Sequence, residues 1–171
     1  MKLVVVTGVE STGKSTLAQA LAAHYQAPCV NEYAREFLEG LGRPYQEADL
    51  PSIARGQLNA QQAAAASRPP LLIADTDLSV IAIWGLFKYN RMPTGVAELL
   101  QHNLPQLYLL PHWDMHWQPD PFRENPDAAS RQTLYTMYQQ LLATTGVPVV
   151  QLQGNQQQQL QQALKAINQI T

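Results

Sequence analysis

The chain has 171 residues, of which 46% are hydrophobic and 14% are charged, a composition typical of a folded globular protein and unlike that of disordered or fibrous chains. This length allows one domain with a substantial core and is short for two, so we expect a single domain over residues 1–171. With 11 basic and 13 acidic residues, the chain lacks the positive charge that nucleic-acid binding needs, so no nucleic-acid partner is expected.

The first predicted element is a strand over residues 3–6, an apolar run that is too short to cross a membrane. This run leads into a polar, glycine-containing loop and not into the small-residue cleavage site of a signal peptide. Cys29 is the lone cysteine, which excludes an intramolecular disulfide and is typical of a reducing compartment. These features favour a cytoplasmic protein with no membrane partner.

The loop after this strand, "GVESTGKST" at residues 8–16, has the spacing G-x-x-x-x-G-K-S and precedes a helix predicted from about Ser15 to Tyr25. In a P-loop of this form, backbone N–H groups surround the nucleotide phosphates while the lysine reaches the β- and γ-phosphates. Lys14 would have that role, and Ser15 would contact Mg²⁺. The glycines permit a tight turn close to the phosphate, and the helix N-terminus favours an anion. We therefore expect ATP and Mg²⁺ to bind at this loop, the alternative being a structural turn.

Apolar runs and helix-like segments alternate along the rest of the chain. Further strands are predicted at residues 27–30, 71–74, 106–110 and 147–152. Helices are predicted after Glu32, ending near Gly40 or Gly42, and over residues 51–66, 78–89 and 96–102. Leu160, Leu164 and Ile167 follow helical spacing, so the glutamine-rich C-terminus is expected to be an amphipathic helix. This alternation predicts an α/β sandwich with a mostly parallel sheet.

Residues 112–130 contain several prolines and charged side chains, and we interpret them as a lid. Arg123 lies in the lid and Arg131 just after it. Because phosphoryl transfer is favoured by cations that close over the triphosphate, one of the two is expected to contact the nucleotide, although either could be a solvated surface residue. His112 and His116 flank Asp114 with a spacing that suits zinc on a helix, but the nearby prolines argue against a helix there.

Aromatic side chains are also available to stack on a nucleotide or nucleoside base, although most such residues in proteins belong to the core. The candidates are Trp84, Trp113, Trp117, Tyr33 and Tyr89.

Three acidic residues follow predicted strands. Asp75 ends a buried strand, where the Mg²⁺-coordinating acid of P-loop proteins is found, while Asp75 and Asp77 are also good helix caps. Glu32 follows the second strand and could accept the proton of a substrate hydroxyl, or could instead cap a helix or pair with Arg35. Ligands of open α/β sheets bind beyond the carboxyl ends of the strands, so Gly8, Glu32 and Asp75 are expected to open onto one crevice.

Taken together, "GVESTGKSTLAQALA", "NEYAREFLE", "LLIADTD" and the arginine-bearing lid resemble the ribosylnicotinamide kinase domain of the bacterial NAD-biosynthesis regulators, within the AAA-like P-loop ATPase/kinase group. The resemblance runs over almost the entire chain. It implies a three-layer P-loop sandwich with a five-stranded parallel sheet in the order 2-3-1-4-5. It also implies transfer of the ATP γ-phosphate to the 5′-hydroxyl of nicotinamide riboside. The regulator's repression and dinucleotide synthesis are not carried over to this chain.

The same resemblance assigns roles to individual residues. On the nucleotide it places Gly8, Gly13, Lys14, Ser15 and Thr16, with Arg123 and Arg131 in the lid. We expect the intervening loop residues Glu10, Ser11 and Thr12 to contact the nucleotide as well. Ser15 and Asp75 lie near Mg²⁺, and Glu32, Tyr33, Arg35 and Asp77 lie toward the substrate. The catalytic set is Lys14, Glu32, Asp75 and Arg123. Two alternatives stay open: a kinase for another nucleoside or small hydroxyl compound, and an ATP-binding regulatory module that hydrolyses slowly.

Overall fold

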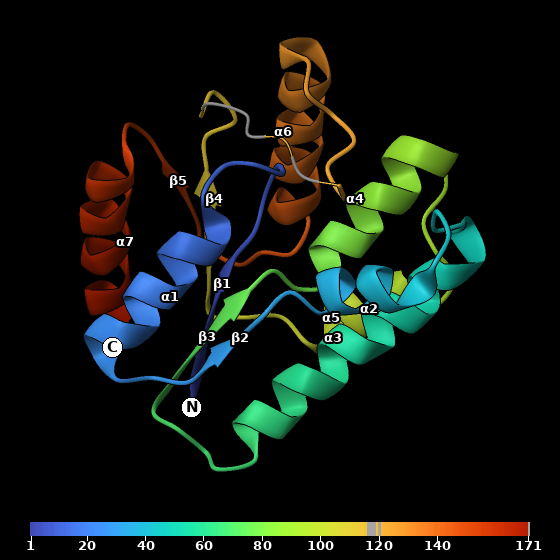
Figure 1. The fold of residues 1–171 in the computed structure, drawn as a ribbon. Helices are drawn as coiled ribbons and strands as arrows, with labels where there is room; N and C mark the ends of the chain where they lie inside the picture. The colour runs from blue at the N-terminus through green and yellow to red at the C-terminus, as the bar shows by residue number, and fades with distance from the viewer. Residues whose placement is uncertain (116–118, 120, 171) are drawn as a thin grey trace.

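The computed structural model describes residues 1–115, 119 and 121–170 of the chain. Within these residues, a five-stranded parallel sheet has the order β2-β3-β1-β4-β5, which confirms the expected fold class and strand order. The strands are β1 (Lys2–Val6), β2 (Cys29–Val30), β3 (Leu71–Asp75), β4 (Leu107–Pro111) and β5 (Val149–Leu152). Helices cover both faces of this sheet (Figure 1).

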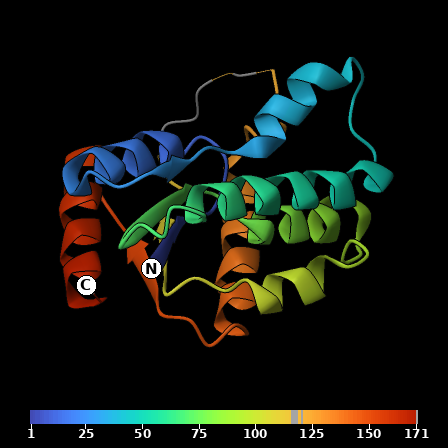
Figure 2. The ribbon, with the colours of Figure 1, turned by 90° about the horizontal axis from the view of Figure 1, so that it is seen from below.

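The helices form two layers with the sheet between them (Figure 2). On one face lie α1 (Lys14–Tyr25) and α7 (Gln156–Ile170), which pack against each other. The opposite layer contains α3 (Leu50–Ala65), α4 (Leu78–Tyr89), α5 (Val96–His102) and α6 (Ala128–Ala143). The short helix α2 (Tyr33–Leu41) packs on α3, and a 3₁₀ turn at Glu47–Asp49 leads into α3.

Alternation along the central strand explains why two layers are needed. Leu3 and Val5 of β1 belong to the hydrophobic cluster under α3 to α6, whereas Val4 and Val6 belong to the cluster under α1 and α7. Successive side chains of a strand point to opposite faces, so a continuous apolar run is stable only if both faces are covered. The same division holds along β3 and β4.

Two strands are shorter than the sequence predicted, and one helix was not predicted. The strands predicted at 27–30 and 147–152 are shorter, at Cys29–Val30 and Val149–Leu152, because Pro28 and Pro148 precede them and proline cannot donate to the ladder. The helix α6 was not predicted at all. Its buried residues Leu134, Tyr135, Tyr138 and Leu142 nevertheless follow helical spacing, a signal that the sequence-based elements left out.

Among the described residues, no helix is both long and apolar enough to span a lipid bilayer.

Candidate functional site

The loop between β1 and α1 is held in a tight curve. Gly8 has φ 134° and Gly13 has φ 79°, values that L side chains rarely adopt. A Cβ at Gly8 would also lie 2.9 Å from Leu110 Cδ1. Gly13 caps α1 without a side-chain hydrogen bond, so the first N–H groups of α1 have no side-chain acceptor from the cap. A helix N-terminus of this kind favours a negatively charged group.

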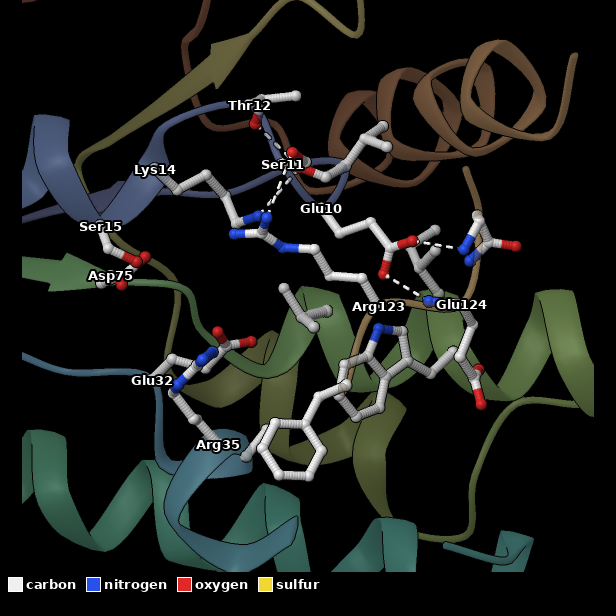
Figure 3. A pocket seen from close by; sticks show the side chains of 18 of the residues that line it. Glu10, Ser11, Thr12, Lys14, Ser15, Glu32, Arg35, Asp75, Arg123 and Glu124 are labelled. Atoms are coloured by element: carbon white, nitrogen blue, oxygen red, sulfur yellow. Dashed lines mark hydrogen bonds between the residues drawn. The ribbon is translucent and has the colours of Figure 1, made fainter. Parts of the chain in front are cut away.

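Two side chains of the loop fold back onto the same carbonyl. The Thr12 hydroxyl donates to the Val9 carbonyl oxygen at 2.8 Å, and Lys14 Nζ donates to it at 2.9 Å. Thr12 is buried, whereas the ammonium of Lys14 lies on the pocket side of the loop (Figure 3). The Lys14 ammonium is therefore held against the backbone of the loop, at the wall of the cavity.

Asp75 stands beside Ser15 at the end of β3 (Figure 3). It is 4% exposed, and its Oδ1 atom has no hydrogen-bond partner. Burial raises the pKa of Asp75, while the charge of Lys14 and a hydrogen bond with Ser15 lower it. A buried carboxylate with an unpaired oxygen next to a P-loop hydroxyl fits a divalent cation, because Mg²⁺ binds through one or two protein oxygens together with phosphate oxygens and water. Among the described residues there is no group of three or more His, Cys, Asp or Glu side chains that could hold a metal ion.

Glu32 follows β2 and precedes α2. It occupies the N-cap position of α2 but makes no side-chain capping hydrogen bond, so capping does not account for it. Burial is the largest cause that raises the pKa of Glu32, and the charge of Asp75 adds to it. The charges of Lys14, Arg35 and Arg123 act in the opposite direction. Groups from the P-loop, β3, α2 and the lid therefore all reach the carboxylate electrostatically.

These residues line one cavity of about 740 Å³, within the size range of small-molecule sites. The structure brings Glu32 and Asp75 into this cavity with the P-loop, although they lie far apart in the sequence. Of the residues predicted for the site, the cavity is lined by Gly8, Glu10, Ser11, Thr12, Gly13, Lys14, Ser15, Thr16, Glu32, Arg35, Asp75 and Arg123.

The lid meets the P-loop through polar contacts. Arg123 reaches over the loop, and its NH1 atom donates to Ser11 Oγ at 3.4 Å. The Glu10 carboxylate accepts hydrogen bonds from the backbone N–H groups of Glu124, at 3.2 Å, and of Asn125 (Figure 3). Arg123 therefore extends from the lid over the P-loop and lines the cavity.

Arg131 does not line the cavity with the P-loop residues. It is 4% exposed and is not among the residues that line the cavity. Its guanidinium donates to the Met115 carbonyl at 2.8 Å and to the carbonyls of Glu10 and Ser11 at 3.5 Å each. The Arg131 guanidinium therefore contacts the backbone of the P-loop from α6 and lies outside the cavity lining.

Two residues assigned to the substrate also lie outside the cavity lining. Asp77 is buried and caps α4, accepting from Ser79 N at 2.9 Å and from the Tyr108 hydroxyl at 2.9 Å, so the capping alternative is the one observed. The ring of Tyr33 packs against α3, where a Cβ on Gly56 would lie 1.9 Å from Tyr33 Cε1. Its aromatic ring therefore fastens α2 to α3.

The aromatic candidates divide between the site and the core. Trp84 lines the cavity and stacks on Tyr45, with ring centroids 5.3 Å apart. Tyr89 and Trp113 pack against the core. His112 pairs with Asp114 at 2.7 Å and contacts the Tyr135 ring. Trp117 and His116 lie outside the described residues.

Sequence reasoning missed the residues at the end of the cavity away from the P-loop. Lys88 of α4 pairs with Glu124 at 2.8 Å and lies 3.8 Å from the centroid of the Tyr45 ring. Phe122 of the lid lies under Arg35, at 5.7 Å. No motif marks these positions, because they come from three separate segments that only the fold brings together.

Comparison with known proteins gives one family match. A family model described as an AAA domain matches residues 3–159.

Several solved structures share the fold. NadR protein in complex with NAD and AMP-PNP is 24% identical with a TM-score of 0.75, and NadR protein in complex with NR is 23% identical with a TM-score of 0.73. Each covers 98% of this chain, and the chain spans about half of each NadR chain, at 49% and 50%. Thymidylate kinase from Ehrlichia chaffeensis is 10% identical with a TM-score of 0.68, covering 99% of this chain and 98% of its own. At these identities the likeness concerns the fold.

Proposed function

Because this chain belongs to the AAA domain family and has the fold of P-loop kinases, we propose that it is an ATP-dependent phosphotransferase acting on nicotinamide riboside. The γ-phosphate would pass to the 5′-hydroxyl of the riboside, giving nicotinamide mononucleotide and ADP. Residues 1–171 would act as one kinase domain with a lid at about residues 112–130. The observation that carries the proposal is the placement of Glu32 in the same cavity as Lys14 and Asp75.

Residues on different walls of this cavity would have different roles in the reaction. The P-loop N–H groups and Lys14 would hold the triphosphate, with Arg123 adding charge from the lid. Mg²⁺ held by Ser15 and Asp75 would supply positive charge to the β- and γ-phosphate oxygens. Glu32 would take the proton of the 5′-hydroxyl as this oxygen bonds to the γ-phosphorus. The bond from that phosphorus to the β–γ bridging oxygen then breaks, and ADP leaves.

Charge at the acceptor end of the cavity supports a cationic acceptor. Besides Glu10 and Asp75, the lining carries the carboxylates of Glu32, Glu36, Glu39 and Glu124. The basic side chains Arg35 and Lys88 are each ion-paired there, with Glu39 at 3.6 Å and with Glu124 at 2.8 Å. Nicotinamide riboside carries a positive pyridinium ring, whereas the common nucleosides are neutral, so the surplus of carboxylates favours the former.

Aromatic rings at the same end add to this preference. The faces of Tyr45 and Phe122 already lie against cationic groups, Lys88 Nζ and the Arg35 guanidinium. Trp84 and Phe87 complete an aromatic lining on the α4 side. Since aromatic faces attract cations, a pyridinium ring would find partners here. The NR complex of a NadR protein with this fold is consistent with such an acceptor.

A panel of acceptors tests the proposal. Purified chain with ATP and Mg²⁺ would be offered nicotinamide riboside, uridine, thymidine or no acceptor, and both ADP and phosphorylated product would be measured. We expect nicotinamide mononucleotide and ADP in equal amounts, with the neutral nucleosides poor acceptors. Equal use of uridine or thymidine would favour the broader nucleoside kinase, and ADP release independent of any acceptor would favour the regulatory ATPase.

The role of Glu32 is tested in the same assay. Glu32→Gln should lower kcat by about 100-fold or more, within the usual contribution of a general base, and should change the KM for ATP little. Glu98→Gln, which alters an exposed carboxylate of α5 outside the cavity, is the matched control. Full activity of Glu32→Gln would remove this residue from the mechanism.

A further inference from the structure

Glu10 is an acidic residue within an anion-binding loop, which needs a physical reason. A carboxylate that faced the phosphates would repel them, since like charges at close range are unfavourable. In Figure 3 the Glu10 carboxylate points toward Glu124 of the lid, while Ser15 and Asp75 lie at the other end of the view. Its negative charge is therefore directed at the lid.

The contacts of this carboxylate are with the lid backbone. Glu10 Oε2 accepts the N–H of Glu124 at 3.2 Å, and Oε1 accepts the N–H of Asn125. Both donors are more than a hundred residues away in sequence, separated from Glu10 by 114 and 115 positions. Hydrogen bonds to an ionised acceptor are stronger than those between neutral groups. A single side chain of the P-loop thus fixes two consecutive peptide groups of the lid.

These two peptide groups immediately follow Arg123. The Arg123 side chain lines the cavity and extends over the loop to Ser11 Oγ, at 3.4 Å. On the other side, Lys88 of α4 pairs with the Glu124 side chain. Glu10 of the P-loop therefore holds the backbone next to Arg123, and Lys88 of α4 holds the side chain of Glu124.

We propose that Glu10 is a positioning residue for Arg123: by binding the lid backbone at residues 124 and 125, it directs the Arg123 guanidinium onto the triphosphate. This inference rests on the triphosphate-binding part of the proposed function and is independent of which acceptor is used. Fixing the backbone in advance limits the conformational freedom that a long arginine side chain loses on contact with phosphate.

A double-mutant cycle in the affinity for AMP-PNP, measured by calorimetry with Mg²⁺, tests the proposal. We expect Arg123→Ala to weaken binding by about 10- to 100-fold, the range for one charge-assisted hydrogen bond. Glu10→Ala should weaken AMP-PNP binding to a similar extent. The affinity of the double variant should lie within about two-fold of that of each single variant. Additive losses, or no measurable AMP-PNP binding by the unaltered chain, would overturn the proposal.

The direction in which Glu10→Gln changes the affinity for AMP-PNP distinguishes a positioning role from a purely electrostatic one. Its amide oxygen can still accept one of the two lid N–H groups, so its affinity should lie between those of the unaltered chain and Glu10→Ala. If Glu10 only repelled the phosphates, removing its charge would strengthen AMP-PNP binding, and that result would refute positioning. Glu98→Gln controls for the loss of one negative charge.

Amide hydrogen exchange checks the contact itself. The N–H groups of Glu124 and Asn125 should exchange faster in Glu10→Ala, and unchanged exchange would contradict the proposal. None of these measurements needs an acceptor. Failure to phosphorylate nicotinamide riboside would therefore refute the proposed function and leave the role of Glu10 to be decided by AMP-PNP binding.

Discussion

Lys14 and Glu32 line the same cavity, from the P-loop and from the residue before α2 (Figure 3). We propose that Lys14 binds phosphate there and that Glu32 accepts a proton. Lys14→Ala should lower kcat/KM by about 100-fold or more, because the side chain is proposed to bind the oxygens that gain charge during transfer. Its loss removes one hydrogen bond to the Val9 carbonyl, so circular dichroism should show an intact fold. Lys165→Ala, on the exposed side of α7, should retain activity. Normal turnover by Lys14→Ala would contradict the assignment of the P-loop.

The pKa of Glu32 predicts an effect on stability with a definite pH dependence. Burial raises this pKa above the ordinary value of 4.5, which means that the folded chain favours the protonated form of Glu32. The stabilisation is complete below pH 4.5 and is lost as the pH rises through the folded-state pKa, where the buried carboxylate ionises. Glu32→Gln removes this ionisation, so thermal denaturation should show a higher Tm than that of the unaltered chain near neutral pH, with a difference that shrinks below pH 4.5.

Glu98→Gln should show no such pH-dependent gain. A Glu32→Gln variant that melts below the unaltered chain at neutral pH would indicate that the carboxylate stabilises the empty site.

Single residues also mark where sequence reasoning reached its limit. The P-loop spacing fixes local backbone geometry, so its residues could be placed from sequence. Asp77 and Arg131 could not, because a cap and a buried support are distinguished from site residues only by the neighbours that the fold provides. Tyr108 and Ser79 around Asp77, and the loop carbonyls around Arg131, come from segments that no spacing connects.

At the scale of elements, the contact between α2 and α3 positions Glu32. The Tyr33 ring lies on Gly56, and the Tyr33 N–H donates to Gln57 Oε1 at 2.7 Å. Gly56→Ala should lower the free energy of unfolding by about 1–3 kcal/mol, because the added methyl group overlaps the ring. Adding Tyr33→Ala should recover part of that loss, which urea denaturation can measure. Purely additive losses would show that Tyr33 does not fill this gap.

The elements themselves were predictable to different degrees. Continuous apolar runs identified all five strands, and in the central strands β1, β3 and β4 these runs reflect burial on both faces. The helix α6 was missed although its buried positions Leu134, Tyr135, Tyr138 and Leu142 follow helical spacing, and it packs against α4. Arg131 lies in the first turn of this helix.

At the scale of the whole molecule, the parallel sheet gathers the site. With β3 between β2 and β1, the segments that follow these strands carry Glu32, Asp75 and the P-loop to one edge of the sheet. The sequence predicted this convergence from the strand pattern, since parallel strands share the direction of their carboxyl ends. It did not predict the acceptor end, where Lys88, Tyr45 and the lid meet, because long-range contacts between loops leave no local pattern.

Transfer of a labelled γ-phosphate tests the central claim most directly. The unaltered chain would be incubated with γ-³²P-labelled ATP, Mg²⁺ and nicotinamide riboside, and the products would be separated. The account predicts label in nicotinamide mononucleotide, in an amount equal to the ADP formed. Label found entirely in inorganic phosphate, at a rate unaffected by the riboside, would contradict it.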